Sequence, residues 1–154
     1  MLTTPHILVG ILIVKKFPNL WGAFLLALIS HFILDFFIPH WNPHLYSEFK
    51  KDKKISFFSL KVILIDCLLA GAFFLYLSWQ AWPDIEKIIT YAGGAFFATL
   101  PDLVEIPYYF LHWKNKLLAD YVHFEHQHQA KASLFWGLVT QLLVSLAALK
   151  QLFF

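Results

Sequence analysis

Long apolar runs separated by short polar breaks dominate this sequence, and each run predicts a helix. The runs cover residues 5–14, 20–38, 59–79, 85–99 and 132–153. A helix needs about 20 apolar residues to cross a bilayer, so the first run is short of a full span. The pattern predicts an all-α fold: an integral membrane helical bundle of about five hydrophobic helices, the first one short, in a single transmembrane domain of residues 1–154.

Two polar stretches, about 40–56 and 114–131, are predicted to be loops, because lysine and histidine are frequent in both. A further break is predicted at residues 100–105, which read Leu-Pro-Asp-Leu-Val-Glu, because proline disrupts the interior of a helix. Residues 106–113 are then expected to continue as an aromatic piece at the membrane interface.

The composition indicates a membrane protein. Hydrophobic residues make up 59% of the chain and charged residues 14%, whereas a soluble domain carries about a quarter charged residues. All 12 basic residues are lysines, which lack the planar fork that arginine offers to phosphate. With a net charge of only +2, no nucleic-acid partner is expected. Cys67 is the one cysteine, so an intramolecular disulfide is excluded.

The lysines predict the orientation, because cytoplasmic loops carry an excess of basic residues. With the N-terminus in the cytoplasm, the inner side would hold Lys50, Lys51, Lys53, Lys54, Lys61, Lys114, Lys116 and Lys131, and the outer side would hold Lys15, Lys16, Lys87 and Lys150. The expected setting is the plasma (inner) membrane, with membrane lipids as partners. The oligomeric state is not predicted.

Several ionisable residues are predicted to meet at one level of the bundle. His31 and Asp35 are four residues apart in the second run, so a helix places them on one face. Threading the chain up and down through a bilayer brings His6, Asp66 and Asp102 to a similar depth. Imidazole and carboxylate ligands suit zinc and also admit manganese or iron. The sequence therefore predicts a divalent metal, zinc before the others, held by these five residues.

Each of these residues also has a structural interpretation. His31 and Asp35 would then form a hydrogen bond that ties two helices together. Asp66 would pair with a lysine or cap a neighbouring helix, and Asp102 would cap the helical piece that follows it. His6 would be an interfacial histidine at a helix start.

The chemistry expected of such a site is metal-assisted hydrolysis. Glu105 is the candidate catalytic base. Four histidines in the two polar stretches are candidates for substrate binding: His40, His44, His126 and His128. The sequence contains no Gly-x-Ser-x-Gly motif, so it gives no indication of a serine nucleophile.

Short motifs resemble two groups of metal-dependent enzymes. His6-x-x-x-Gly10, Leu100-Pro101-Asp102 and the later histidine cluster resemble a family of membrane-bound metal-dependent hydrolases. His31-x-x-x-Asp35 followed by His40 is similar to a ligand motif of zinc-dependent phospholipase C and its nuclease relatives. The resemblance implies a helical, metal-binding hydrolase acting on a phosphoester or lipid-like substrate. It also implies that the ligands are His6, His31, Asp35 and Asp102.

The chain departs from the hydrolase pattern in two places. Leu103-Val104-Glu105 stands where that family tends to carry a further acidic residue and a histidine. The segment at 123–128 reads His-Phe-Glu-His-Gln-His, where the family tends to carry a His-Arg-Gly-x-Thr-His-Ser type of segment.

Three functions are consistent with the sequence. The first is a membrane-embedded hydrolase whose site opens at the lipid–water boundary. The second is a non-enzymatic protein that handles metal ions or protons, and the third is a structural membrane protein whose polar residues hold helices together. A transport path needs polar residues through both leaflets, so clustering at one level favours the enzyme. Metal content separates the third function from the other two.

Overall fold

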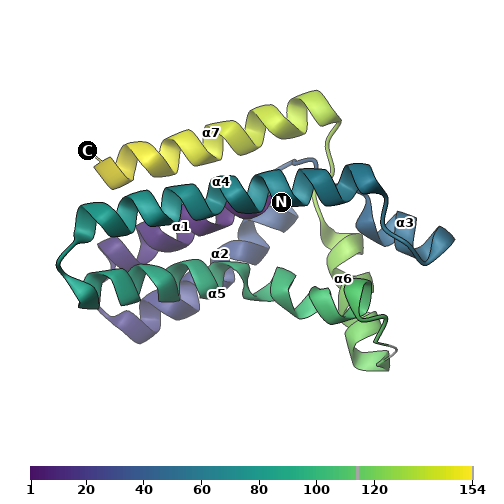
Figure 1. The fold of residues 1–154 in the computed structure, drawn as a ribbon, viewed down its shortest axis with the longest axis horizontal. Coiled ribbons are helices and arrows are strands. Elements are labelled where there is room, and N and C mark those ends of the chain that lie inside the picture. The colour runs from purple at the N-terminus through teal and green to yellow at the C-terminus, as the bar shows by residue number, and fades with distance from the viewer. Residues whose placement is uncertain (114, 154) are drawn as a thin grey trace.

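The computed structural model describes residues 1–113 and 115–153 of the chain, and most of these residues are in helices (Figure 1). Seven helices and no strand occur in these residues. They are α1 (Thr3–Lys16), α2 (Leu20–Phe37), α3 (Leu45–Asp52), α4 (Phe57–Ala81), α5 (Ile85–Phe110), α6 (Lys116–His128) and α7 (Leu134–Phe153). The predicted all-α fold is confirmed. Lys114, which entered the orientation argument, lies outside the described residues.

α1 is the central helix of the bundle and packs against α2, α4, α5 and α7. Leu8 and Ile11 on α1 are fully buried, and the apolar core around them takes side chains from all four neighbours. Because other helices surround α1, its side chains meet protein rather than lipid. The polar residues at its N-terminal end are therefore held inside the bundle.

Three helices, α2, α4 and α7, are long and apolar enough to cross a membrane. α2 shows how they are built: an exposed apolar stripe at four-residue spacing runs through Trp21, Leu25, Ile29, Ile33 and Phe37. The opposite face of α2 buries Ser30, His31 and Asp35. Apolar residues outside and polar residues inside are expected of a helix in lipid.

Three candidate spans are fewer than the five that the sequence predicted. α1 has only 14 residues. α5 has 26 residues but includes the charged residues Glu86, Lys87, Asp102 and Glu105. The coarser prediction of a membrane protein agrees with the three long apolar helices.

α5 continues through Pro101 and Pro107, so the break predicted at residues 100–105 is wrong. Pro101 removes one N–H from the hydrogen-bond ladder and crowds the preceding turn, which bends a helix when its neighbours hold both halves in place. Figure 1 shows α5 bending past its midpoint, on the side of the molecule where α6 lies. The bent half carries Asp102 and Glu105.

Both stretches predicted to be loops contain a helix, α3 in the first and α6 in the second. Phe49 of α3, Tyr109 of α5 and Val122 of α6 form a small apolar core. The ring of Tyr46 stacks on that of His126 with 4.1 Å between the centroids. Packing of one apolar face thus outweighs the polar composition that suggested loops. The two polar stretches lie together at one end of the bundle.

α1 and α5 cross at a pair of glycines. A Cβ on Gly94 would lie 2.6 Å from the carbonyl oxygen of Gly10, and a Cβ on Gly10 would lie 2.7 Å from the Cβ of Ala98. Small residues are what allow two helix backbones to approach so closely. His6 precedes Gly10 by one helical turn, so the crossing fixes His6 beside the part of α5 that leads to Asp102.

Replacing Gly10 with alanine is expected to lower stability, because the added methyl forces α1 and α5 apart. The expected loss is about 1–3 kcal/mol, the usual cost of overpacking a core. Gly71→Ala is the matched control, since no atom lies within 4 Å of the Cβ position at Gly71. The stability of that control should rise by up to about 1 kcal/mol, because alanine has a higher helix propensity than glycine. Thermal midpoints in detergent measure both, and equal midpoints for the two variants would contradict the close crossing.

Candidate metal centre

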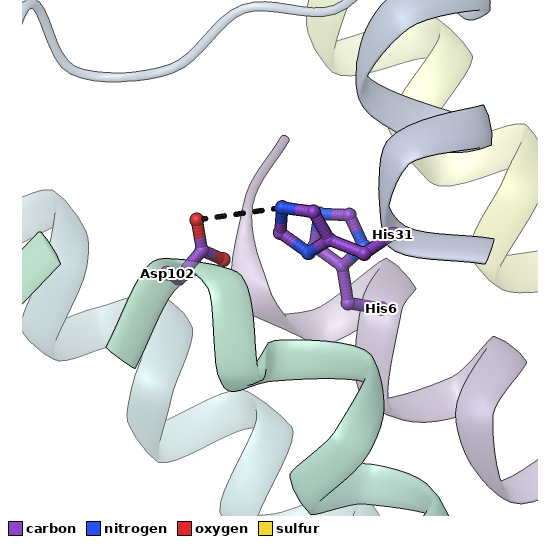
Figure 2. A group of neighbouring side chains, drawn as sticks. All are labelled: His6, His31 and Asp102. Carbon is purple, nitrogen blue, oxygen red and sulfur yellow. Dashed lines mark ion pairs between the residues drawn. The ribbon is translucent and has the colours of Figure 1, made fainter. Parts of the chain in front are cut away.

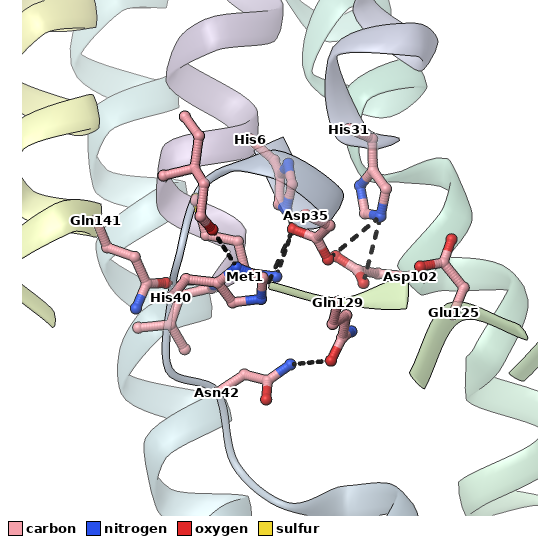
Figure 3. Close-up of polar contacts among 12 residues, drawn as sticks. Met1, His6, His31, Asp35, His40, Asn42, Asp102, Glu125, Gln129 and Gln141 are labelled. Carbon is pink, nitrogen blue, oxygen red and sulfur yellow. Dashed lines mark hydrogen bonds and ion pairs between the residues drawn. The ribbon is translucent and has the colours of Figure 1, made fainter. Parts of the chain in front are cut away.

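Six ionisable side chains from four helices and one connecting segment converge at the end of α1. They are His6 of α1, His31 and Asp35 of α2, His40 just after α2, Asp102 of α5 and Glu125 of α6. Figure 2 shows His6, His31 and Asp102 turned toward one another, and Figure 3 shows the surrounding polar contacts. The sequence predicted that His6, His31, Asp35, Asp66 and Asp102 meet. The structure brings His6, His31, Asp35 and Asp102 together, and Asp66 is not part of this group.

Asp35 is the centre of the cluster and is completely buried. Its Oδ1 lies 3.1 Å from Nε2 of His6, and its Oδ2 lies 3.9 Å from Nε2 of His31. The amine of Met1 donates to Oδ1 at 2.6 Å. A carboxylate in such a position is costly unless cations or hydrogen-bond donors compensate its charge.

His31 presents a fixed lone pair to the cluster. Its Nδ1 lies 2.9 Å from the carbonyl oxygen of Ala98, and because a carbonyl only accepts, Nδ1 carries the proton. Nε2 of the neutral ring is then free to bind a cation, and it lies 3.9 Å from both Asp35 Oδ2 and Asp102 Oδ1. A backbone acceptor that orients a metal-binding imidazole is the usual arrangement at metal sites.

His40 is held in the same way, although the sequence predicted it to bind substrate. Its Nδ1 lies 2.9 Å from the carbonyl oxygen of Ile38, and its Nε2 lies 4.0 Å from Asp35 Oδ1. Burial lowers the pKa of His40 to about 4, so the ring is neutral at pH 7 and offers its lone pair. The structure therefore places His40 among the candidate ligands.

The segment between α6 and α7 fixes His40 in place. The backbone N–H of His40 donates to the carbonyl of Ala130, and the N–H of Ala132 donates to the carbonyl of His40. Ala130 in turn donates to the carbonyl of Asp35. Gly137 of α7 completes this support, since a Cβ there would collide with the backbone of Trp41. Contacts between segments far apart in sequence thus position His40.

The polar atoms of the cluster fit a metal ion. Within the described residues, His6 Nδ1, Asp35 Oδ2 and His40 Nε2 are buried without a hydrogen-bond partner, each at a cost of about 1–3 kcal/mol. Nε2 of His6 faces Asp35 Oδ1 at 3.1 Å. The separations of 3.9–4.0 Å around Asp35 are too long for hydrogen bonds. Nitrogen and oxygen ligands of a tetrahedral zinc ion lie about 3.3 Å apart. A small inward movement would let one cation bind Asp35 Oδ2, Nε2 of His40 and one nitrogen of His6.

Two sets of three ligand atoms lie within 4.8 Å of one another. One set is His6, His31 and Asp102, and the other is His31, Asp35 and Glu125. Both sets use His31, whose one available nitrogen can bind a single ion. The geometry therefore supports either one ion in a shared site or two ions of which only one contacts His31.

Glu125 is the candidate ligand that the sequence analysis missed. Its side chain is almost fully buried and accepts a hydrogen bond of 3.0 Å from the hydroxyl of Tyr121. Burial raises the pKa of Glu125 above its usual value. The residues at 118, 121, 122 and 125 follow helical spacing, which was the available signal that Glu125 lies on the inner face of a helix.

Glu105 lies on α5 close to one helical turn beyond Asp102, partly buried beside the cluster. Burial raises its pKa well above the usual value, and the neighbouring carboxylates of Asp102 and Glu125 add to that shift. A raised pKa lets a carboxyl group keep its proton to a higher pH than usual, which is the property required of a general acid. The environment of Glu105 thus suits a general acid as well as the base predicted from the sequence.

The remaining predicted histidines lie outside the ligand cluster. A cavity of about 790 Å³ adjoins the cluster, and His44 and His126 are among its lining residues. His128 is exposed; its Nδ1 is paired with the carbonyl of Phe124 and its ring packs on Phe36. The cavity is therefore consistent with substrate contact for His44 and His126, and packing accounts for the position of His128.

Asp66 takes the capping role that was the alternative to metal binding. Its Oδ2 accepts from the backbone N–H of Thr3 at 2.5 Å, and its Oδ1 accepts from the N–H and hydroxyl of Thr4 at 3.2 and 2.7 Å. The carboxylate thus satisfies free donors at the start of α1, where the helix dipole also favours a negative charge. Neither set of converging ligand atoms found in the described residues includes Asp66.

Asp66→Asn is therefore expected to lower stability by about 1–2 kcal/mol and to leave metal affinity unchanged, because it removes one acceptor and the charge at the start of α1. Asp84→Asn is the control: Asp84 caps α5 by accepting from the N–H of Lys87, and asparagine caps about as well as aspartate. Thermal midpoint and metal stoichiometry are measured on both. Loss of metal from Asp66→Asn at an unchanged midpoint would restore Asp66 to the ligand set.

Comparisons of this chain with protein families, with curated proteins and with solved structures find no match. The resemblance to metal-dependent hydrolases therefore stays a prediction from short motifs. The interpretation of the site depends on its own geometry.

Proposed function

We propose that this chain is a membrane-embedded, metal-dependent hydrolase that acts on a phosphoester or lipid-like substrate at the lipid–water boundary. The observation that carries the proposal is the buried carboxylate of Asp35 facing three imidazoles. In two of these, His31 and His40, Nδ1 lies beside a backbone carbonyl. Their Nε2 atoms are unpaired and face Asp35.

His6, His31, Asp35 and Asp102 would hold the metal, with His40 and Glu125 close enough to complete its coordination. The mixture of nitrogen and oxygen donors suits zinc and also admits manganese or iron. A metal of this kind supplies Lewis-acid activation of water and of a phosphoryl oxygen.

The side chains around the cluster would provide the proton transfers and the substrate contacts. Glu105, with its raised pKa, would hold a proton for the leaving group. Lys131 Nζ lies 3.1 Å from His126 Nε2, and both residues line the adjoining cavity. The ammonium donates to the ring nitrogen, and its remaining N–H groups and positive charge would attract and orient an anionic phosphoryl group.

One contact favours a different candidate, the structural membrane protein. The amine of Met1 lies 2.6 Å from Asp35 Oδ1, and both groups are buried, so an ion pair alone could offset the charge of Asp35. That pair leaves Asp35 Oδ2, Nδ1 of His6 and Nε2 of His40 without a hydrogen-bond partner in the described residues. A bound metal would account for Asp35 Oδ2, Nε2 of His40 and one nitrogen of His6, and the ion pair does not.

Asp35→Asn is expected to lower metal affinity by more than about 100-fold, since even the outer partners of metal ligands contribute 10–100-fold. Hydrolysis of a nitrophenyl phosphate diester by detergent-purified protein should fall with it. The apo protein should regain activity on addition of zinc, manganese or iron. Asp120→Asn, which changes an exposed aspartate on α6, is the control and should behave as the unmodified chain.

Circular dichroism and the thermal midpoint show whether each variant is folded. A folded, unmodified chain that binds no divalent metal would contradict the proposal and favour the ion pair. Stoichiometric metal without hydrolysis of monoesters, diesters or phospholipids would favour the non-enzymatic, metal-handling candidate.

A further inference from the structure

The cavity beside the metal cluster extends between α4 and α5 as an apolar groove. Along α4 its lining residues are Ile63, Asp66, Cys67, Ala70, Gly71 and Phe74, and along α5 they include Ala92, Ala95, Phe96 and Thr99. Their spacing of three and four residues puts each set on one helix face. Two helix faces with small residues between larger apolar ones thus form the walls.

The other end of the same cavity is polar. His40, Asp102, Glu105, His126 and Lys131 line it there, and these include two candidate ligands and the groups expected to contact a phosphoryl substrate. Asp66 does not make the apolar part polar, because Thr3 and Thr4 already occupy its carboxylate oxygens. One continuous space therefore joins an apolar slot to the metal cluster.

We propose that the substrate is a single-chain amphiphile, or one chain of a lipid, whose hydrocarbon tail lies in the groove between α4 and α5 while its phosphoryl end meets the metal cluster. This inference rests on the proposed hydrolase function and names its substrate class. The α5 wall rises about 15 Å from Ala92 to Asp102, at 1.5 Å per residue. The cavity volume of about 790 Å³ is in the range of ligand sites.

The setting of the groove selects a hydrocarbon chain over other occupants. α4 is one of the three helices able to span a membrane, and its opposite face exposes Leu64, Ile65, Leu68 and Leu69. A peptide at this depth would need partners for its own backbone polar groups, and the apolar walls provide none. An alkyl chain needs no such partners.

Gly71 keeps the slot open. No atom lies within 4 Å of the position that its Cβ would take, so no close packing requires glycine there. Glycine in a helix interior is less stable than alanine by up to about 1 kcal/mol. Its lack of a side chain leaves space in the groove for the ligand. Ala72, the next residue, is exposed and is not among the lining residues.

The test compares Gly71→Leu with the matched control Ala72→Leu. The substrates are the methyl and hexadecyl nitrophenyl phosphate diesters, assayed in a bile-salt detergent that has no linear alkyl chain. The unmodified chain and Ala72→Leu should prefer the hexadecyl diester. Gly71→Leu should lose at least tenfold in kcat/KM for the hexadecyl diester, because the leucine fills the slot. Its kcat/KM for the methyl diester should be unchanged, because the metal cluster is unchanged.

Metal-dependent hydrolysis of both diesters at equal rates, unaffected by Gly71→Leu, would overturn the groove proposal and leave the hydrolase function standing. If neither diester is hydrolysed, the proposed function fails by itself and ligand binding still tests the groove.

Cys67 reports on binding in the groove. It is the sole cysteine, it is exposed and it lines the groove. Hexadecyl phosphate should slow its reaction with a maleimide in the unmodified chain but not in Gly71→Leu. Equal labelling rates with and without hexadecyl phosphate would overturn the proposal.

Discussion

The charge of the buried Asp35 carboxylate is the constraint on which the polar end of this bundle depends. A carboxylate inside an apolar bundle is tolerated only with cations or donors around it. α1 brings His6, the segment after α2 brings His40, and His31 precedes Asp35 by one turn on α2 itself. Two backbone contacts fix the groups that face Asp35. The glycine crossing of α1 and α5 fixes His6, and the hydrogen bond to Ala130 fixes His40.

The same constraint relates the cluster to the lipid around it. α2 exposes an apolar stripe on one face and buries its ionisable residues on the other. The polar groups are thus kept from lipid, and they adjoin a cavity whose far part is apolar. A substrate that is itself polar at one end and apolar along its length would match both parts. This correspondence connects the proposed chemistry to the proposed substrate class.

Local patterns predicted the features that depend on one helix at a time. The four-residue spacing of His31 and Asp35 placed both on one face, and the apolar runs predicted the long helices. The prediction failed where tertiary packing decides. α5 passes through Pro101 because neighbours hold both of its halves, and α6 forms because Val122 packs against α3 and α5. His40 and Glu125 reach the cluster through contacts between distant segments. Helical spacing could place Glu125 on an inner helix face, but no local spacing specifies that either residue meets Asp35.

The most direct test of this account is anomalous diffraction at the zinc absorption edge from crystals of zinc-saturated protein. The account predicts a strong peak about 2.0–2.2 Å from Nε2 of His31 and from an oxygen of Asp35, with Nδ1 of His31 still donating to Ala98. A cluster without an anomalous peak, in which the Met1 amine still pairs with Asp35, would contradict it. The buried carboxylate would then be part of an ion pair that holds helices together, not part of a metal centre.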